Sequence, residues 1–320
     1  MQKRKIWENF LQWVLPCVLL VIALVLSIYD FNNKMEIAIQ TVVDDQAEQI
    51  GLYYAAGVED KLKALGNITD AVASIMAARL DRGEAFLNEK LDTLMKASDA
   101  YMVVYCATNG TGFLNDRRQI DMTELNYYDG ILGETPHYLF TRSDGINGQM
   151  AFIYVCPITN SGNVNGYLLS YMEPAEMSDF FENSVYGDKA FFSLVDRNGT
   201  IMACYGATQG TKILQNDFWN SLKGVAESLG SWTLFDRQQQ KGDNGILHVN
   251  ENGVGKILCH FPIADTAWNL VVGIDESYLS GIQQSFRGPI VDLIVKISIS
   301  IAAALIVITV INVLVRIKVS

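Results

Sequence analysis

The chain has 320 residues, half of them apolar, and a formal net charge of −11. This length allows about two domains. Residues 30–288 are more acidic than the whole chain, because basic residues gather near the two ends. This negative charge argues against nucleic-acid binding and against adhesion to an anionic membrane surface.

Two largely apolar stretches lie near the ends of the chain, at residues 10–31 and 288–315. Each is long enough for the roughly 20 helical residues that cross a hydrocarbon core. The first stretch could instead be a cleaved signal peptide, but no small-residue cleavage site follows it. We therefore expect two transmembrane helices.

Basic residues lie outside both stretches and set the expected orientation. Lys3, Arg4 and Lys5 precede the first, and Arg316 and Lys318 follow the second. Because basic residues favour the cytoplasmic side, we expect a cytoplasmic tail and stub, with everything between the spans outside. The ranges are residues 1–9 for the tail, 316–320 for the stub and 32–287 for the outer part.

Two charged residues near the outer end of the second span, Asp292 and Lys296, are one helical turn apart. They could be a functional pair inside the membrane. We favour an interfacial ion pair whose lysine stem extends toward water.

Residues 32–84 are expected to form one long helix after the first span. Between residues 39 and 75 the apolar side chains recur every three or four positions, as in an amphipathic helix. The helix would be roughly 65 Å long. Glycines at positions 51, 57 and 66 could bend or break it, and one face could pair with a second copy.

The region after this helix contains two similar segments, residues 85–173 and 187–284. Each has a strand, an Asn-Gly-Thr turn, an intervening segment, a strand ending in Pro-Ile and a final apolar strand. A repeat of this length indicates two copies of one domain. Residues 174–186, which open with Pro174, are expected to connect them as a helix. The predicted fold class is α+β.

Several local features complete this prediction. Residues 116–144 form a tyrosine-rich excursion from the first sheet, suited to holding a small ligand. Within it, Arg142 and Asp144 are expected to be a solvated pair at a turn. In the second module, Asn216 could cap a helix, and residues 236–245 are expected to be a loop.

Five segments together resemble the double Cache domain, the tandem PAS-like extracytoplasmic sensor of bacterial transmembrane receptors. They are residues 191–201, 156–158, 261–263, 268–273 and 121–134. The resemblance implies antiparallel sheets in a membrane-distal first module and a membrane-proximal second module, with a bacterial plasma-membrane location. It implies a small-molecule ligand, surrounding membrane lipid, a homodimer and a cytoplasmic signalling domain, beyond residue 320 or on a partner.

Amino-acid-binding members of this family carry an arginine, an aromatic pair and a later aspartate in the distal module. Tyr127 and Tyr128 match the aromatic pair, but Leu125 stands in place of the arginine and Tyr171 in place of the aspartate. A buried α-amino acid needs partners for both of its charges. The resemblance therefore does not predict an amino-acid sensor.

The candidate ligand-binding residues are the tyrosines of the first module and one arginine, because tyrosines stack on ligands and offer a hydroxyl. They are Tyr127, Tyr128, Tyr138, Arg118, Tyr154 and Tyr171. Alternatively, these tyrosines are core residues. The chain would then be a non-enzymatic envelope scaffold or interaction subunit with two membrane anchors.

Catalytic and metal-binding patterns find little support. The three histidines lack metal-ligand spacing, and no nucleophile or haem-attachment motif occurs. We expect no enzyme activity, no metal and no cofactor. Cys17 falls in the first span. The other cysteines, Cys106, Cys156, Cys204 and Cys259, fall on predicted strands. The PAS-like sheet that the resemblance implies does not place the two cysteine-bearing strands of a module side by side, so we expect buried free thiols.

Overall fold

The structure, a computed structural model, describes residues 2–79, 82–177, 180–181, 189–206, 217–251 and 253–319. Its helices are α1 (Gln2–Ala77), α2 (Glu84–Ala97), η2 (Met122–Glu124), α3 (Tyr128–Ile131), η3 (Pro174–Met177), α5 (Phe218–Lys223), α6 (Leu229–Lys241) and α7 (Glu276–Val319). The chain divides into two compact units, one of Met1–Gln46 with Ser277–Ser320 and one of Ala47–Glu276.

The first unit holds the two ends of the chain, and α7 contains a candidate membrane span. Within the described residues, Ile290–Ile308 is long and apolar enough to cross a membrane, by length and composition. Asp292 and Lys296 form the expected ion pair, 2.5 Å apart. Residues 10–31 are helical within α1, but most side chains of their first half lie outside the described residues. The two-pass topology stays a prediction.

In the second unit, α1 supplies the spine helix from Ala47 to Ala77. Val58, Leu62 and Leu65 are buried, at the three- and four-residue steps expected for an amphipathic helix. The glycines expected to bend or break the helix do not interrupt it, because α1 continues to Ala77.

These glycines instead make room for aromatic side chains packed on the helix. A Cβ atom at the three positions would lie between 1.9 and 2.9 Å from the nearest side-chain atom, which is too close. The neighbours are Phe261 for Gly51, Phe180 for Gly57 and the Tyr138 hydroxyl for Gly66. Tyr138 and Phe261 come from different sheets, so both sheets dock on the spine at glycines.

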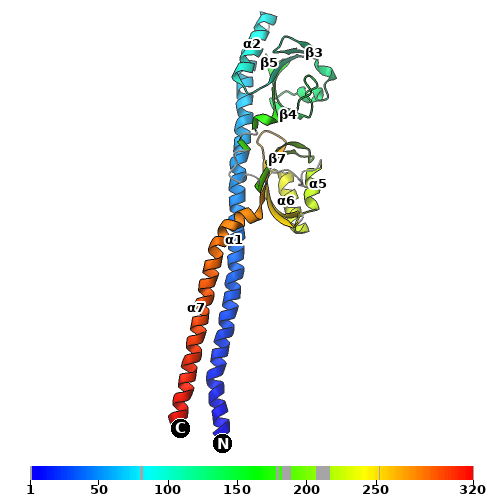
Figure 1. Ribbon diagram of the computed structural model, residues 1–320. Helices are drawn as coiled ribbons and strands as arrows, with labels where there is room; N and C mark the ends of the chain where they lie inside the picture. The colour runs from blue at the N-terminus through cyan, green and yellow to red at the C-terminus, as the bar shows by residue number, and fades with distance from the viewer. Residues whose placement is uncertain are drawn as a thin grey trace. The chain divides into compact units, whose positions relative to one another are not determined.

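The first module is built on a six-stranded antiparallel sheet in the order β3-β2-β1-β6-β5-β4. Figure 1 labels three of these strands, β3, β4 and β5. Its strands are β1 (Met102–Ala107), β2 (Thr111–Leu114), β3 (Gln119–Asp121), β4 (His137–Thr141), β5 (Ala151–Asn160) and β6 (Asn163–Met172). One face carries the module's hydrophobic core. The other faces α1, where the buried hydroxyls of Thr69 and Ser170 lie 2.7 Å apart.

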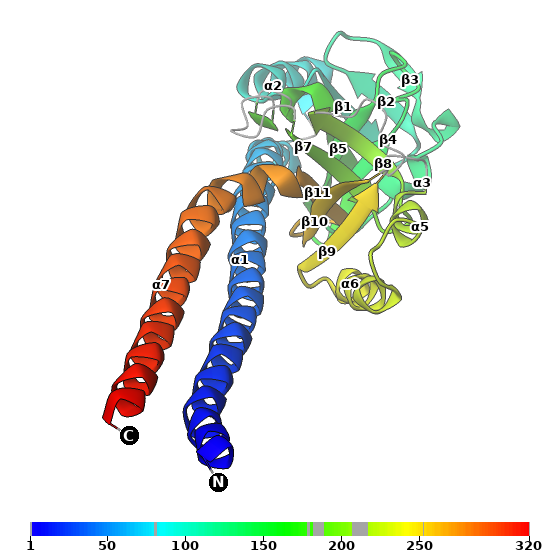
Figure 2. The ribbon, with the colours of Figure 1, turned by 60° about the horizontal axis from the view of Figure 1, so that its bottom comes forward.

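The second module has five antiparallel strands in the order β8-β7-β11-β10-β9. They are β7 (Ala190–Asp196), β8 (Ile201–Gly206), β9 (Gly245–Glu251), β10 (Val254–Pro262) and β11 (Trp268–Asp275). Helices α5 and α6 cover one face of this sheet (Figure 2). Its strand order matches β2-β1-β6-β5-β4 of the first module. The predicted repeat is therefore confirmed, with β3 as the addition in the first module.

The Asn-Gly-Thr turns join β1 to β2 and β7 to β8, as expected. Their glycines, Gly110 and Gly199, have φ values of 87° and 84°, a conformation that glycine adopts without steric cost. The turn residues thus explain why the same tripeptide recurs in both modules.

Several predicted boundaries were wrong or fall elsewhere. Residues 116–144 are not a single excursion, because they contain β3, η2, α3 and β4. The loop expected at residues 236–245 is mostly helix, since α6 runs to Lys241. Pro174 opens only the short η3 in the described residues; most of the expected connecting helix, and Asn216, lie outside them. The N-cap of α5 is Asp217. The domain boundaries stay predictions.

The four strand cysteines are thiols and not disulfides, as predicted. Cys106, Cys156 and Cys259 are buried, whereas Cys204 is half-buried. Strands β1 and β5 are not neighbours in their sheet, nor are β8 and β10 in theirs. The strand order accounts for the absence of a disulfide among these four described residues.

Candidate functional site

A pocket of about 530 Å³, partly open to solvent, lies beside the core of the first module. This volume is in the range of sites that hold small molecules, roughly 300–1,000 Å³. Apolar Ile120, Leu125 and Ile146 line it and also pack against the core. The remaining lining residues are Arg118, Asp121, Glu124, Asn126, Ser143 and Gly145.

The segment from β3 to α3 forms one wall of this pocket. Asp121 begins η2 as its N-cap, and its Oδ1 accepts from the backbone N and the hydroxyl of Thr123, at 2.9 and 2.6 Å. These two hydrogen bonds hold the pKa of the Asp121 carboxyl below its usual value. The cap fixes the start of the wall and leaves Glu124 and Asn126 on the pocket lining.

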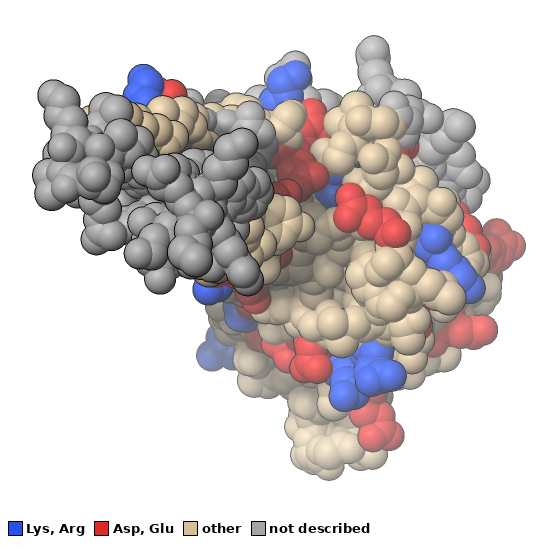
Figure 3. Space-filling model, turned by 90° about the horizontal axis from the view of Figure 1, so that it is seen from below, with Lys and Arg blue, Asp and Glu red and all other residues tan. Residues whose placement is uncertain are grey.

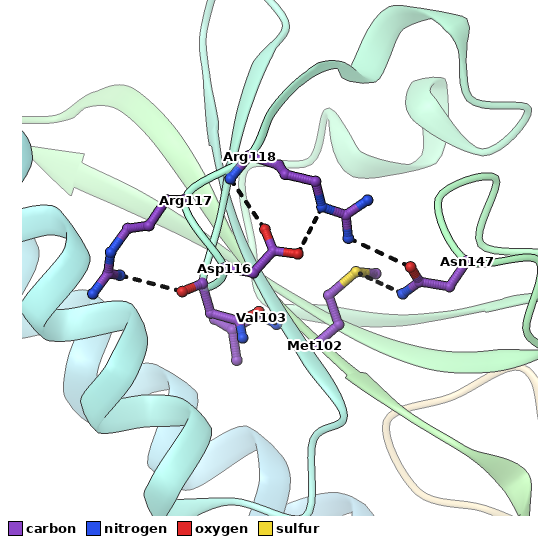
Figure 4. Close-up of polar contacts among 7 residues, drawn as sticks. Met102, Val103, Asp116, Arg117, Arg118 and Asn147 are labelled. Atoms are coloured by element: carbon purple, nitrogen blue, oxygen red, sulfur yellow. Dashed lines mark hydrogen bonds and ion pairs between the residues drawn. The ribbon is translucent and has the colours of Figure 1, made fainter.

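Arg118 lies at the edge of the pocket, between two partners (Figure 4). Its Nε donates to Oδ2 of Asp116 at 2.6 Å, and its terminal NH2 donates to Oδ1 of Asn147 at 3.5 Å. Burial raises the pKa of Asp116, but the hydrogen bonds from Arg118 outweigh it and leave that pKa lowered. The guanidinium charge is therefore already paired before any ligand arrives.

The loop from residue 143 to 150 forms the opposite wall, and Asp144 organises it. The Oδ2 of Asp144 accepts from the hydroxyl of Tyr101 at 2.8 Å. Its Oδ1 accepts three backbone N–H groups, from Ile146, Asn147 and Gly148, at 2.7 to 2.9 Å. Burial raises the pKa of this carboxyl, but the hydrogen bonds outweigh burial and lower it.

The predicted solvated pair at this turn was therefore wrong for Asp144, which is 0% exposed. The prediction failed because the hydrogen-bond partners of the Asp144 carboxylate are mainly backbone N–H groups, and no sequence pattern reveals these. Arg142, by contrast, is exposed as expected.

Two tyrosines join this loop to the core. The Tyr127 hydroxyl donates to the backbone O of Asp144 at 2.7 Å, and it lies 3.1 Å from the hydroxyl of Tyr171. Since Tyr127 uses its proton on the carbonyl, Tyr171 is the donor of that second bond. Burial raises the pKa of Tyr127 to about 12 and that of Tyr171 well above its usual value. Both hydroxyls stay protonated and hold the loop in place.

The structure brings four of the six predicted site residues to this face of the sheet. Arg118 lines the pocket, while Tyr127, Tyr171 and the half-buried Tyr128 belong to or pack against the adjoining core. Leu125, which stands where an arginine was considered, also lines the pocket.

The other two predicted residues, Tyr138 and Tyr154, lie on the opposite face of the sheet. The Tyr138 hydroxyl donates to the backbone O of Leu62 at 2.8 Å, and Tyr154 bonds to the carboxylate of Asp70 at 2.9 and 3.0 Å. Both partners are on α1. These two tyrosines therefore dock the first sheet on α1. For all six predicted site residues, contact with a ligand stays a prediction.

Sequence reasoning missed part of the pocket lining, namely Glu124, Asn126, Ser143 and Ile146. Only the resemblance of residues 121–134 to the double Cache family pointed to the wall from β3 to α3. The face of Tyr154 could have been found from alternation, because Tyr154 lies between core residues Ile153 and Val155 on β5.

The matching face of the second module is filled by side chains. Phe218, Leu222, Trp232 and Phe235 from α5 and α6 pack on the sheet. Buried His260 lies against the Phe235 ring, with centroids 4.5 Å apart. In the described part of the chain, neither nitrogen of the His260 ring has a hydrogen-bond partner.

No metal centre emerges within the described residues, since none of their His, Cys, Asp and Glu side chains gather in groups of three or more that could hold an ion. The polar groups of the pocket instead suit hydrogen bonding to an organic molecule.

Solved structures share this arrangement of spine and sheets. The ligand-binding domain of the Pseudomonas fluorescens chemoreceptor CtaA, in complex with L-isoleucine, matches 78% of this chain and 98% of that domain, with TM-score 0.62 and 13% identity. That of the Campylobacter jejuni chemoreceptor Tlp3, in complex with L-valine, matches 75% and 95%, with TM-score 0.55 and 15% identity. The chain has the fold of these domains.

The extracellular domain of rpHK1S-Z16, described as a histidine kinase, matches 73% of this chain and 95% of that domain, with TM-score 0.55 and 16% identity. These likenesses confirm the double Cache architecture at the level of fold. No protein-family model and no curated protein sequence matches the chain.

Proposed function

We propose that the chain is a small-molecule sensor whose ligand binds in the pocket of the first module. The observation that carries this proposal is the pocket itself, with apolar Ile120, Leu125 and Ile146 beside polar groups on two walls. One wall is held in place by the fully bonded Asp144. Preorganised walls reduce the entropic cost of binding.

The similarity of fold supports the same function. CtaA and Tlp3 are chemoreceptors, and their domains were solved with L-isoleucine and L-valine. Because the identity is 13% and 15%, the ligand does not carry over with the fold.

We propose further that the ligand is not an α-amino acid. Where an acid would pair with the ammonium group, this chain has Tyr171, fully buried and bonded to Tyr127. Where an arginine would pair with the carboxylate it has Leu125, and Arg118 is already paired with Asp116. An ammonium group could still meet Glu124 of the pocket lining, but a carboxylate left unpaired in such a site loses its hydration without compensation.

In this proposal, residues 32–287 lie outside a bacterial plasma membrane and both chain ends lie in the cytoplasm. The receptor is a homodimer, and it passes its signal through the membrane helices to a cytoplasmic signalling domain or partner. The chain itself is not an enzyme. Figure 3 supports the exclusion of nucleic acid, since acidic and basic side chains intersperse on the face in view and form no continuous basic surface among its described residues.

The test is a thermal-shift screen of the full-length chain in detergent against amino acids, amines, carboxylic acids, sugars and nucleobases. Binding stabilises the folded state by about 2.7 kcal/mol at a hundredfold excess over Kd. We expect a compound outside the amino acids to raise Tm. Ser143→Trp, which fills the pocket, should remove the shift, whereas Thr233→Trp, on the exposed side of α6, should retain it.

A shift that survives Ser143→Trp would place the site elsewhere. A screen in which no compound raises Tm would favour the alternative, an envelope scaffold or interaction subunit.

A further inference from the structure

Strand β4 connects the pocket wall to the far side of the first sheet. Its Leu139 packs against the core beside the pocket. After Thr141 the chain turns through Arg142 into Ser143, which lines the pocket. The Thr141 hydroxyl donates to the backbone O of Ser143 at 2.6 Å, and its oxygen lies 3.3 Å from the Ser143 N–H. A displacement of Ser143 would therefore be transmitted to β4.

On the opposite face, β4 contacts the spine through Tyr138. The Tyr138 hydroxyl donates to the backbone O of Leu62 at 2.8 Å, in space left by Gly66. Burial raises the pKa of Tyr138 to about 12, so this hydroxyl remains a donor at ordinary pH. Opposite Tyr138 in the sheet is Tyr154, which is bonded to Asp70 of the same helix.

The same face of the first sheet also contacts the second module, at a cluster that we call the module junction: Tyr138, Phe152 and Trp268. The Trp268 ring lies 5.2 Å from that of Phe152 and 6.1 Å from that of Tyr138, between centroids. Trp268 is 6% exposed. Aromatic pairs at these separations have preferred orientations, so their energy depends on how the rings are placed.

Trp268 is also held firmly within its own module. Its backbone N–H donates to the Thr266 hydroxyl, and its backbone O accepts from Ile263, both at 3.0 Å. It is the first residue of β11, which ends at Asp275, directly before the start of α7 at Glu276. A shift of Trp268 would thus act on the strand that leads into that helix.

We propose that β4 couples the pocket of the first module to β11 of the second, through contact between Tyr138 and Trp268. The proposal rests on the proposed function in one respect, namely that a small-molecule ligand is what occupies the pocket. The coupling requires that Ser143 take one position when the pocket is occupied and another when it is empty, and that β4 move with Ser143. Close-packed interfaces have few alternative arrangements. A displacement of β4 should therefore move the Trp268 ring, and with it β11.

The test uses Ser143→Trp as a permanent occupant of the pocket, so it needs no natural ligand. Hydrogen–deuterium exchange of the full-length chain in nanodiscs reports on β4 and β11 separately. We expect Ser143→Trp to change amide exchange by about fivefold in both strands, the size expected for one aromatic contact. With Trp268→Leu also present, the change should persist in β4 and disappear from β11.

Tyr138→Leu provides a second break at the same contact, in case Trp268→Leu unfolds the module. The matched control is Phe113→Leu, on β2 toward the other edge of the same sheet, because its ring packs on Tyr105, with centroids 6.1 Å apart, away from the module junction. It should leave the response of β11 intact.

An undiminished response of β11 in both Trp268→Leu and Tyr138→Leu would overturn the proposal. The proposal would also be overturned if Ser143→Trp, without a second substitution, changed amide exchange in neither strand or in β4 alone. A failed ligand screen with the expected exchange pattern would reject the sensor and retain the coupling, so the two failures are distinguishable.

Discussion

The two modules have the same strand order, but different side chains occupy the core face of each sheet. In the first, Tyr101, Tyr127 and Tyr171 bond to one another or to Asp144, and a pocket lies beside them. In the second, helices α5 and α6 fill the face with rings, and His260 is buried among them.

The comparison shows that the strand order does not decide which module binds a ligand. A buried hydroxyl network can hold a loop open beside a core, because its hydrogen bonds fix the loop without filling the space. A face filled by phenylalanine and tryptophan gains hydrophobic free energy instead. We therefore expect the second module to contribute mainly stability.

The largest effect should come from opening a cavity in the second module. Phe235→Ala removes a fully buried ring and should cost about 3–5 kcal/mol, as large-to-small core substitutions do. Urea denaturation followed by tryptophan fluorescence measures it. Leu234→Ala is the matched control, since Leu234 is 56% exposed, and it should change stability by less than about 0.5 kcal/mol. Equal losses in both variants would contradict the filled core.

Acid should weaken the second module before the first. Burial lowers the pKa of His260 to about 4, below its usual value of about 6.5, so the unfolded chain takes up the proton first as pH falls. The stability from neutral His260 is complete above about pH 6.5 and is lost toward pH 4, by about 3 kcal/mol. Hydrogen exchange of β9–β11 across this range measures the loss.

His260→Leu should remove most of this pH dependence. Asp144 gives the contrasting behaviour in the first module, because its pKa is lowered and its contribution is present above about pH 3.9 and is lost below it. If strands β1–β6 lost protection in the same window as β9–β11, the contrast between modules would be wrong.

Docking on the spine should be less tolerant in the second module. A Cβ at Gly51 would lie 1.9 Å from the Phe261 ring, which is 1% exposed and cannot move freely. Gly51→Ala should therefore cost about 1–3 kcal/mol by overpacking. At Gly66 the nearest atom is the Tyr138 hydroxyl at 2.9 Å, and Gly66→Ala should be within about 1 kcal/mol of neutral because alanine favours the helix. Equal changes in Tm for the two variants would show that the close contacts do not matter.

The smallest effect concerns the tyrosine network. Tyr127→Phe removes the hydroxyl that bonds to the backbone of Asp144 and should cost about 1–2 kcal/mol, because a buried acceptor loses its partner. Amides of residues 145–148 should then exchange faster. Tyr128→Phe, at a half-buried neighbour, should leave them unchanged; faster exchange in both variants would argue against a specific role for Tyr127.

Much of the fold could be predicted from the sequence. The three- and four-residue spacing predicted the spine, and the repeated Asn-Gly-Thr and Pro-Ile motifs predicted two modules. Strand β4 was missed because it is an edge strand inside a polar, tyrosine-rich segment, and its first four residues are all half-buried, so that no alternation marks it. The end of α6 was missed because its run of three glutamines, Gln238 to Gln240, resembles a loop.

The site was less predictable than the fold. Leu125 and Tyr171 could be read as departures from a known pattern; Leu125 lines the pocket, and Tyr171 belongs to the core beside it. The burial of Asp144 depends on backbone N–H groups, and the face of Tyr138 depends on strand register. Neither property is written in residue types, so tertiary structure was needed to separate pocket residues from docking residues.

The most direct test of the central claim is ligand-dependent hydrogen exchange on the full-length chain, using the compound that gives the largest thermal shift. Binding in the pocket of the first module should protect residues 118–126 and 143–148 and leave β9 and α6 of the second module unchanged at the same saturation. Protection confined to the second module, or a thermal shift without protection around the first pocket, would contradict the claim.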